Sequence, residues 1–137
     1  MIREERIALN GMKGSIAYHV AGDGPVVVLL HGWGASWYLW QDTMIALANA
    51  GYCVYAPDHI GCGASSKPRL WYTPRDYAVY LDAFLDTMGL QQFVLVGHSL
   101  GGHIALSYAL RHRQRVKQLV LVNPAYAPLR QIAPTRA

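Results

Sequence analysis

Acidic residues are absent from the last part of the chain, where no Asp or Glu follows Asp86 among the 137 residues. A nucleophilic serine normally acts through a histidine that a carboxylate orients and stabilises. No residue after Asp86 can therefore provide such a carboxylate.

Cysteine is scarce, and long apolar runs are missing. Cys53 lies in a strand pattern and Cys62 in a loop, an arrangement that favours two reduced thiols over a disulfide. No apolar run approaches the ~20 residues needed to cross a bilayer, and residues 1–6 carry charges where a secretory signal has an apolar segment. We therefore expect a cytoplasmic protein with no membrane partner.

Signatures for nucleotides, metals and nucleic acids are also missing. The Gly-x-Gly segments at 32–34 and 61–63 lack the third glycine of a dinucleotide site, and no Gly-Lys-Ser or Gly-Lys-Thr occurs. The six histidines show no metal-ligand spacing. The net charge of +4 gathers partly in residues 111–117, where cations suit the carboxyl end of a helix. We expect no cofactor, no metal and no nucleic-acid partner.

Strand-like and helix-like segments alternate along the chain. With 53% hydrophobic residues, a chain of this length can bury the core of one domain, and we assign residues 1–137 to a single domain. The alternation predicts an α/β fold with a mostly parallel, twisted sheet and flanking helices. The expected elements are strands at 6–10 and 15–20 around a turn at 11–14, a strand at 26–30, a helix from 37 to 51, a strand at 52–56, a helix from 73 to 89, a strand from 93, a helix after 99 and a strand at 118–122.

A serine stands where a predicted strand passes into a predicted helix. The apolar strand from Phe93 runs into Gly-x-Ser-x-Gly at residues 97–101, and an amphipathic helical segment follows. A serine in this turn has strained backbone geometry, and the two flanking glycines let neighbouring segments pass close to it. The first helical N–H groups, including that of Leu100, face a developing oxyanion. The pattern predicts a nucleophile at Ser99.

Two further motifs follow predicted strands. His31-Gly32-Trp33-Gly34 comes directly after the apolar run at 26–30, and Asp58-x-x-Gly61-x-Gly63-x-Ser65 follows the strand at 52–56. The first resembles the His-Gly oxyanion loop of α/β hydrolases, and the second resembles a turn of the same family. With the three motifs in the family's order between residues 7 and 123, the chain resembles the amino-terminal portion of an α/β hydrolase with a serine nucleophile.

The resemblance implies a hydrolase that transfers an acyl group from an ester-like or acyl substrate to Ser99. The backbone N–H groups of Trp33 and Leu100 would form its oxyanion hole. Ser99 argues against dehalogenase and epoxide hydrolase types, which place a carboxylate at this position, whereas esterase, lipase, thioesterase, carbon–carbon bond hydrolase and perhydrolase types stay open. The other residues implied for the nucleophile elbow and its adjoining loop are Gly97, His98, Gly101, His31 and Gly32.

The same resemblance implies a cap and two more strands after the strand at 118–122, whose loops would deliver the acid and the base. We therefore expect a fold truncated before them. In some members the acid follows the strand that here ends in Asn123, a residue without charge. Two hypotheses follow: a serine hydrolase whose acid and base are absent from this chain, or a catalytically inactive remnant that acts as a binding or assembly module.

Other residues have less direct links to catalysis. His103 follows Ser99 by one helical turn, but a side chain at that position more often packs beside the strand than reaches the hydroxyl. We expect hydrogen-bonded, loop-shaping roles for His98, His31 and His59, and a structural role in its own turn for Asp58. The aromatic candidates for the wall of an acyl pocket are Trp33, Trp37, Tyr38, Trp71 and Tyr72.

The strand at 118–122 is apolar on both faces. Without the two further strands it would form an exposed sheet edge. We expect the chain to self-associate through it.

Overall fold

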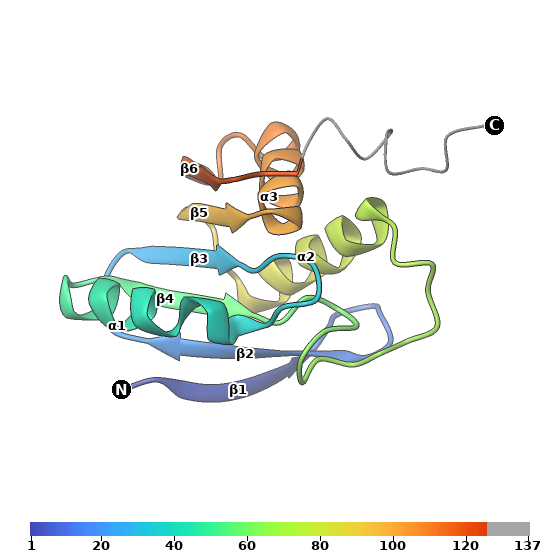
Figure 1. Cartoon of the computed structure of the whole chain (residues 1–137), viewed down its shortest axis with the longest axis horizontal. Coiled ribbons are helices and arrows are strands. Elements are labelled where there is room, and N and C mark those ends of the chain that lie inside the picture. The colour runs from blue at the N-terminus through green and yellow to red at the C-terminus, as the bar shows by residue number, and fades with distance from the viewer. Residues whose placement is uncertain (126–137) are drawn as a thin grey trace.

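A computed structural model describes residues 1–125, which form a six-stranded sheet with helices on both faces (Figure 1). The strand order is β1-β2-β4-β3-β5-β6. β1 and β2 pair antiparallel, as do β2 and β4, whereas β4, β3, β5 and β6 run parallel. The elements are β1 (Arg3–Ala8), β2 (Ser15–Ala21), β3 (Val26–Leu30), a 3₁₀ turn η1 (Trp37–Trp40), α1 (Gln41–Asn49), β4 (Cys53–Pro57), α2 (Pro74–Met88), β5 (Phe93–His98), α3 (Leu100–Arg111) and β6 (Val116–Val122).

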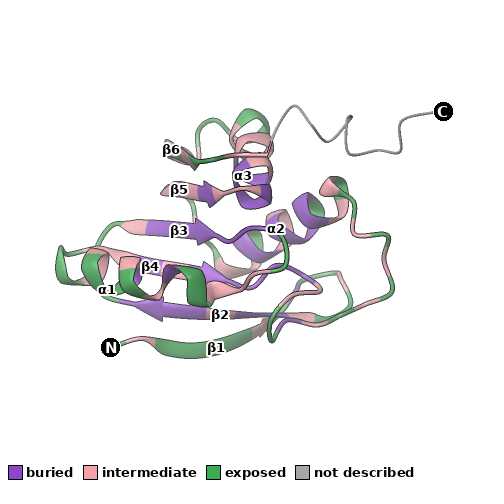
Figure 2. Ribbon diagram, in the orientation of Figure 1, coloured by how far each residue is buried: buried purple, intermediate pink, exposed green. Residues whose placement is uncertain are grey.

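Strand β3 lies at the centre of the fold and is covered on both faces. Val28 and Leu30 pack with α2 and α3, while Val27 and Leu29 pack with α1. All four are buried, and Figure 2 shows most of β3 in the buried colour. A strand covered on both faces needs an apolar residue at every position, and the uninterrupted run from Val26 supplies them.

Helix α2 begins and ends where the sequence predicts. The Thr73 hydroxyl accepts the N–H of Asp76, and the Asp76 carboxylate accepts the N–H of Thr73, at 3.2 and 3.0 Å. Pro74 occupies the first turn, and Gly89 ends the helix in the left-handed conformation at φ +71°. This reciprocal capping followed by a glycine stop confirms the expected helix from 73 to 89.

The expected single helix from 37 to 51 is wrong in its first turn, which is the 3₁₀ turn η1. The Trp37 N–H donates to the Asp58 carboxylate at 2.8 Å, so this end of the segment is held by a loop from elsewhere in the chain. Regular α-helix begins only at Gln41 and ends at Asn49. A side-chain acceptor 21 residues away leaves no signal in local periodicity.

Several strand boundaries also differ from the sequence-based ranges, and β2 extends one residue further, to Ala21. β1 covers Arg3–Ala8, because it pairs in register with β2 from Arg3 opposite Val20 to Ala8 opposite Ser15. Its charged residues lie on an edge strand, where solvent reaches them, and give no apolar signal. β4 covers Cys53–Pro57 in place of 52–56. β6 begins at Val116, two residues before the predicted start, because it pairs with Phe93 across a register shift.

Strand β6 is one edge of the sheet formed by the described residues. Leu119 and Leu121 pack against the cluster beneath α3, whereas Val120 and Val122 are 44% and 38% exposed. Figure 2 shows β6 in the exposed and intermediate colours. The expected apolar edge is therefore present in this part of the chain. Among residues 1–125, no helix combines the length and the apolar character required to cross a membrane.

Candidate active site

Ser99 occupies the sharp turn between β5 and α3. Its backbone angles are φ +56° and ψ −120°, a conformation that costs energy for any residue with a side chain. The Ser99 carbonyl accepts hydrogen bonds from the N–H groups of Gly102 and Ala125, both at 2.9 Å, and its own N–H donates to Val122 at 3.1 Å. Although Ser99 is the N-cap of α3, its hydroxyl makes no capping hydrogen bond. The backbone is thus fixed while the hydroxyl stays free of a capping role.

The glycines on either side of Ser99 are required by close backbone contacts. A Cβ atom on Gly97 would lie 2.2 Å from the carbonyl oxygen of Gly101. A Cβ atom on Gly101 would lie 2.4 Å from the carbonyl oxygen of His31 and 2.5 Å from that of Leu30. Backbone atoms cannot move aside as a flexible side chain can, so only glycine fits at both positions.

The loop after β3 passes directly beside the Ser99 turn. A Cβ atom on Gly32 would lie 3.1 Å from the Ser99 Cβ and 3.1 Å from the His98 Nδ1. The structure therefore brings together the two segments that the sequence marked as elbow and oxyanion loop.

The peptide between Gly32 and Trp33 has a defined orientation. The Gly32 carbonyl accepts the His31 Nδ1–H at 2.7 Å and the Ala35 N–H at 3.3 Å. No peptide bond among the described residues is cis, and in a planar trans peptide the N–H points opposite to the carbonyl. The Trp33 N–H therefore points away from the groups that hold the Gly32 carbonyl.

A reciprocal pair of hydrogen bonds links this loop to the one after β4. The His59 N–H donates to His31 Nε2 at 3.0 Å, and the His59 Nε2–H donates to the His31 carbonyl at 2.9 Å. Because His31 Nε2 accepts, the proton of that ring lies on Nδ1, where it reaches Gly32. The expected loop-shaping roles of His31 and His59 agree with these contacts.

Both rings are held neutral by their surroundings. His31 is 0% and His59 5% exposed, and burial disfavours an imidazolium ion. Burial lowers the pKa of His31, and burial together with the neighbouring His31 ring lowers the pKa of His59 to about 3. Neither ring is therefore placed to carry charge at neutral pH.

Asp58 organises its own turn, as expected. One carboxylate oxygen accepts the Trp37 N–H at 2.8 Å and the other accepts the Ala64 N–H at 2.9 Å. The Ser65 hydroxyl donates to the Asp58 carbonyl at 2.7 Å. A Cβ atom on Gly63 would lie 2.2 Å from the carboxylate, which explains a glycine there. Asp58 is 2% exposed, and both of its carboxylate oxygens are occupied by these hydrogen bonds.

Ser99 opens into a cavity of about 480 Å³. Trp33 and Tyr72 line it as predicted, whereas Trp37 stacks on His19 with ring centroids 3.5 Å apart, and Trp71 is 94% exposed and does not line it. Of the five aromatic candidates, Trp37, Tyr38 and Trp71 do not line this cavity. The lining residues are Trp33, Tyr72, Pro74, Tyr77, Ser99, Leu100 and Ala125.

Tyr77 is a lining residue that the sequence did not single out. Its spacing on α2 indicates only a buried helix face, and it is indeed buried. No sequence signal separates an apolar helix residue that faces a cavity from one that faces the core. Its place beside the site depends on how the first turn of α2 meets the loop after β3.

The histidines nearest to Ser99 in sequence make no hydrogen bond to its hydroxyl. His98 Nδ1 is buried with no hydrogen-bond partner within residues 1–125, so the expected hydrogen-bonded role is wrong for this nitrogen. His103 lines a separate cleft between α2 and α3, beside Arg75 and Arg111. In the described region, no histidine ring hydrogen-bonds to the Ser99 hydroxyl. Asn123, at φ +45°, is exposed.

No metal centre is found in the described part of the chain. No three His, Cys, Asp or Glu side chains converge there in a way that could hold an ion. Cys53 and Cys62 are free, half-buried thiols, and burial and the nearby Asp58 carboxylate raise the pKa of Cys62.

Residues 25–136 match the family described as alpha/beta hydrolase fold. Together with the sheet order and the serine turn, this match shows that the chain belongs to the α/β hydrolase family.

Named relatives within the family have different activities. The chain is 34% identical to a soluble epoxide hydrolase from Corynebacterium over 122 residues, which cover 89% of this chain and 42% of the relative. It is 35% identical to the human (lyso)-N-acylphosphatidylethanolamine lipase over 117 residues, which cover 82% of this chain and 34% of the relative. The structure of a haloalkane dehalogenase from Bradyrhizobium elkani superposes with a TM-score of 0.85 at 35% identity, covering 90% of this chain and 42% of that one.

The chain spans between 31% and 42% of the length of the curated relatives it matches. The match to residues 25–136 shows the family and the fold. The nucleophile and substrate of this chain are matters for a proposal.

Proposed function

We propose that this chain carries the nucleophile and oxyanion donors of a serine hydrolase that acts on esters. The observation that supports this most directly is the Ser99 turn, with its strained backbone, its hydroxyl free of a capping bond and its place on a cavity of about 480 Å³. A hydroxyl at the elbow favours acyl transfer over the carboxylate chemistry of dehalogenase and epoxide hydrolase types. The named lipase relative is consistent with this choice.

In the proposed reaction, the Ser99 oxygen forms a bond to the carbonyl carbon of the ester. The resulting oxyanion accepts hydrogen bonds from the N–H groups of Leu100, at the first turn of α3, and Trp33. The bond to the alcohol oxygen then breaks, and the alcohol leaves with the proton that the Ser99 hydroxyl gave up. Water attacks the acyl-serine, releasing the carboxylic acid and restoring the hydroxyl.

The oxyanion side of this proposal has support in the loop geometry. Gly32 lies in contact with Ser99, and its carbonyl is held by His31 and Ala35. The adjoining Trp33 N–H is thereby fixed in one direction before any substrate binds. Donors fixed in advance are those that stabilise a transition state most, because no reorganisation is needed during reaction.

No histidine of the described residues is positioned as a base by a hydrogen bond to the Ser99 hydroxyl. All six histidines of the chain lie within residues 1–125, and none of their rings bonds to the Ser99 hydroxyl. The reactivity of Ser99 is therefore best tested with a base supplied from solution.

The test is labelling of Ser99 by an alkyl fluorophosphonate, in which the serine oxygen bonds to phosphorus and fluoride leaves. Imidazole in the buffer would accept the hydroxyl proton. We expect labelling that rises with imidazole concentration, that Ser99→Ala abolishes, and that Ser107→Ala on the same helix leaves unchanged. Equal labelling of the Ser99→Ala chain, or none beyond that of heat-denatured chain, would overturn the proposal and favour the binding or assembly module.

A further inference from the structure

Two cavities adjoin across one aromatic wall beside Ser99. The cavity that contains Ser99 measures about 480 Å³, and a second of about 280 Å³ lies over the loop of Gly61 and Cys62. Trp33, Tyr72 and Tyr77 line both. We call the second one the Cys62 lobe, and its other lining residues are Gly34, Gly61 and Cys62. The Ser99 cavity and the Cys62 lobe therefore lie side by side along these three rings.

Two of the three rings in this wall, Tyr72 and Tyr77, are held by neighbouring groups. The Tyr72 hydroxyl donates to the Pro68 carbonyl at 2.5 Å, and Tyr72 itself has φ +55°. A Cβ atom on Gly61 would lie 2.2 Å from the Tyr72 ring, so the ring lies directly on the glycine. The Tyr77 ring packs edge-on against the His59 ring, with the two ring centroids 5.6 Å apart. The size of the Cys62 lobe is thus set by Gly61 and by the position of Tyr72.

Both cavities are uncharged. No Asp, Glu, Lys, Arg or His side chain of the described residues lines either one. Burial raises the pKa of Tyr72, and burial raises that of Tyr77 to about 12, so both phenols stay neutral. A charged group placed there would lose hydration without gaining a partner. The lining therefore suits an apolar, uncharged ligand.

We propose that the Cys62 lobe is the specificity pocket of this site and receives an uncharged apolar substituent of the ester whose carbonyl carbon reacts at Ser99. This assignment rests on the proposed function. Gly61 and Tyr72 set the length of substituent that fits, and Cys62 lies within the lobe.

The test uses fluorophosphonates with linear butyl, hexyl and octyl chains, and one octyl-length probe that ends in a carboxylate, all in imidazole buffer. We expect the Ser99 labelling rate to rise about threefold per methylene while the lobe fills, and the carboxylate probe to react at least about tenfold more slowly than octyl. Cys62→Phe fills the lobe and should remove the preference for longer chains. Leu110→Phe, at an exposed position on α3, is the matched control and should retain it.

The outcomes separate this inference from the proposed function. Ser99 labelling at the same rate by every probe would overturn the pocket assignment and leave the serine hydrolase in place. A folded Cys62→Phe chain with unchanged chain-length preference would also overturn it. Should that variant fail to fold, the probe series on the unaltered chain decides. Failure of all probes to label Ser99 would overturn the proposed function itself.

Discussion

Two pairs of histidines flank the Ser99 turn, and their environments differ. In the pair formed by His31 and His59, reciprocal hydrogen bonds to the backbone fix both rings and assign the proton of His31 to one nitrogen. In the other pair, His98 and His103, the Nδ1 atom of each ring is buried without a partner among the described residues. We call the side of the turn formed by the loops after β3 and β4 the complete side, because both histidine rings there are hydrogen-bonded. We call the side formed by β5, α3 and β6 the open side, because His98 Nδ1 and His103 Nδ1 have no partner among the described residues.

The complete side depends on close backbone packing, and Gly101→Ala should break it. The new Cβ would meet the carbonyl oxygens of His31 and Leu30 at 2.4 and 2.5 Å. We expect a loss of about 3 kcal/mol in the free energy of unfolding, at the upper end of overpacking effects. Urea unfolding measures it. Gly11→Ala, where φ is +71° and nothing lies within 4 Å of the new atom, should cost only about 1 kcal/mol. Equal losses in the two variants would contradict the packing argument.

Acid should weaken the same side through His59. Its pKa is about 3 in the folded chain and about 6.5 when unfolded, so between these values the unfolded state binds more protons. The free energy of unfolding should therefore be complete above pH 6.5 and fall as pH drops toward 3, by at most about 1.4 kcal/mol per pH unit for this one group. The lowered pKa of His31 acts in the same direction.

His59→Gln isolates that contribution, because its amide can donate to the His31 carbonyl but does not titrate. We expect a shallower loss of stability between pH 6.5 and 5 in urea unfolding. The difference measured at pH 7.5, where the wild-type ring is neutral, reports the altered packing alone. An identical pH slope in the two chains would show that His59 is not a source of the acid sensitivity.

The sequence predicted the complete side better than the open one, for physical reasons. Gly97 and Gly101 record steric contacts that no other residue satisfies, so a short motif was enough to locate the Ser99 turn. The apolar run of β3 likewise needs burial on both faces. In contrast, the hydrogen-bond state of His98 depends on what packs over β5, and Tyr77 looks like any buried helix residue. The hydrogen bonding of His98 and the position of Tyr77 depend on tertiary contacts that no local sequence pattern encodes.

On the open side, we propose that the chain self-associates through β6. Val120 and Val122 expose apolar surface beside the unpaired edge of the described sheet, and such edges pair with other chains. Replacing both with Lys should weaken association at least about tenfold, the equivalent of losing one buried valine contact. Concentration-dependent light scattering measures this. Val79→Lys on α2 is the matched control, since Val79 and Val120 are both 44% exposed. A wild-type chain that stays monomeric at all concentrations would rule the proposal out.

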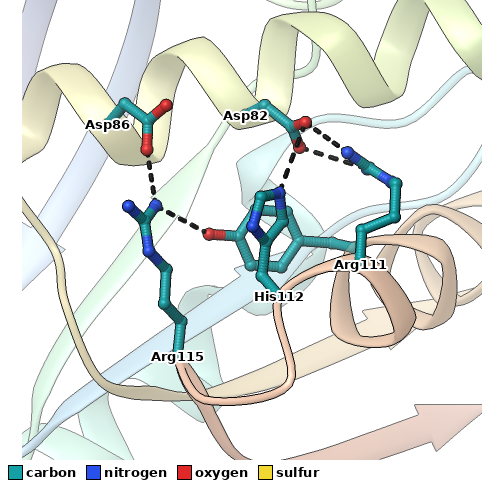
Figure 3. Close-up of polar contacts among 6 residues, drawn as sticks. Asp82, Asp86, Arg111, His112 and Arg115 are labelled. Carbon is teal, nitrogen blue, oxygen red and sulfur yellow. Dashed lines mark hydrogen bonds and ion pairs between the residues drawn. The ribbon is translucent and has the colours of Figure 1, made fainter.

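The smallest effect on the free energy of unfolding is expected at the ion pairs between α2 and α3, which lie away from the Ser99 turn. Asp82 on α2 pairs with Arg111 through two hydrogen bonds and lies 3.6 Å from His112, while Asp86 pairs with Arg115 (Figure 3). The Asp82 and Arg111 side chains are 26% and 42% exposed, so water and salt screen much of their attraction.

Asp82→Asn should therefore cost no more than about 1 kcal/mol, and the cost should shrink in 1 M salt. A double-mutant cycle with Arg111→Gln, measured by urea unfolding, gives the pair energy free of other changes. A coupling above about 2 kcal/mol that persists in salt would mean that the pair is effectively buried. In that case the position of α3, and with it the Ser99 turn at its first residue, would depend on charges at its far end. A small, salt-sensitive coupling would leave the backbone contacts of Gly97, Gly101 and Ser99 as what holds Ser99 in place.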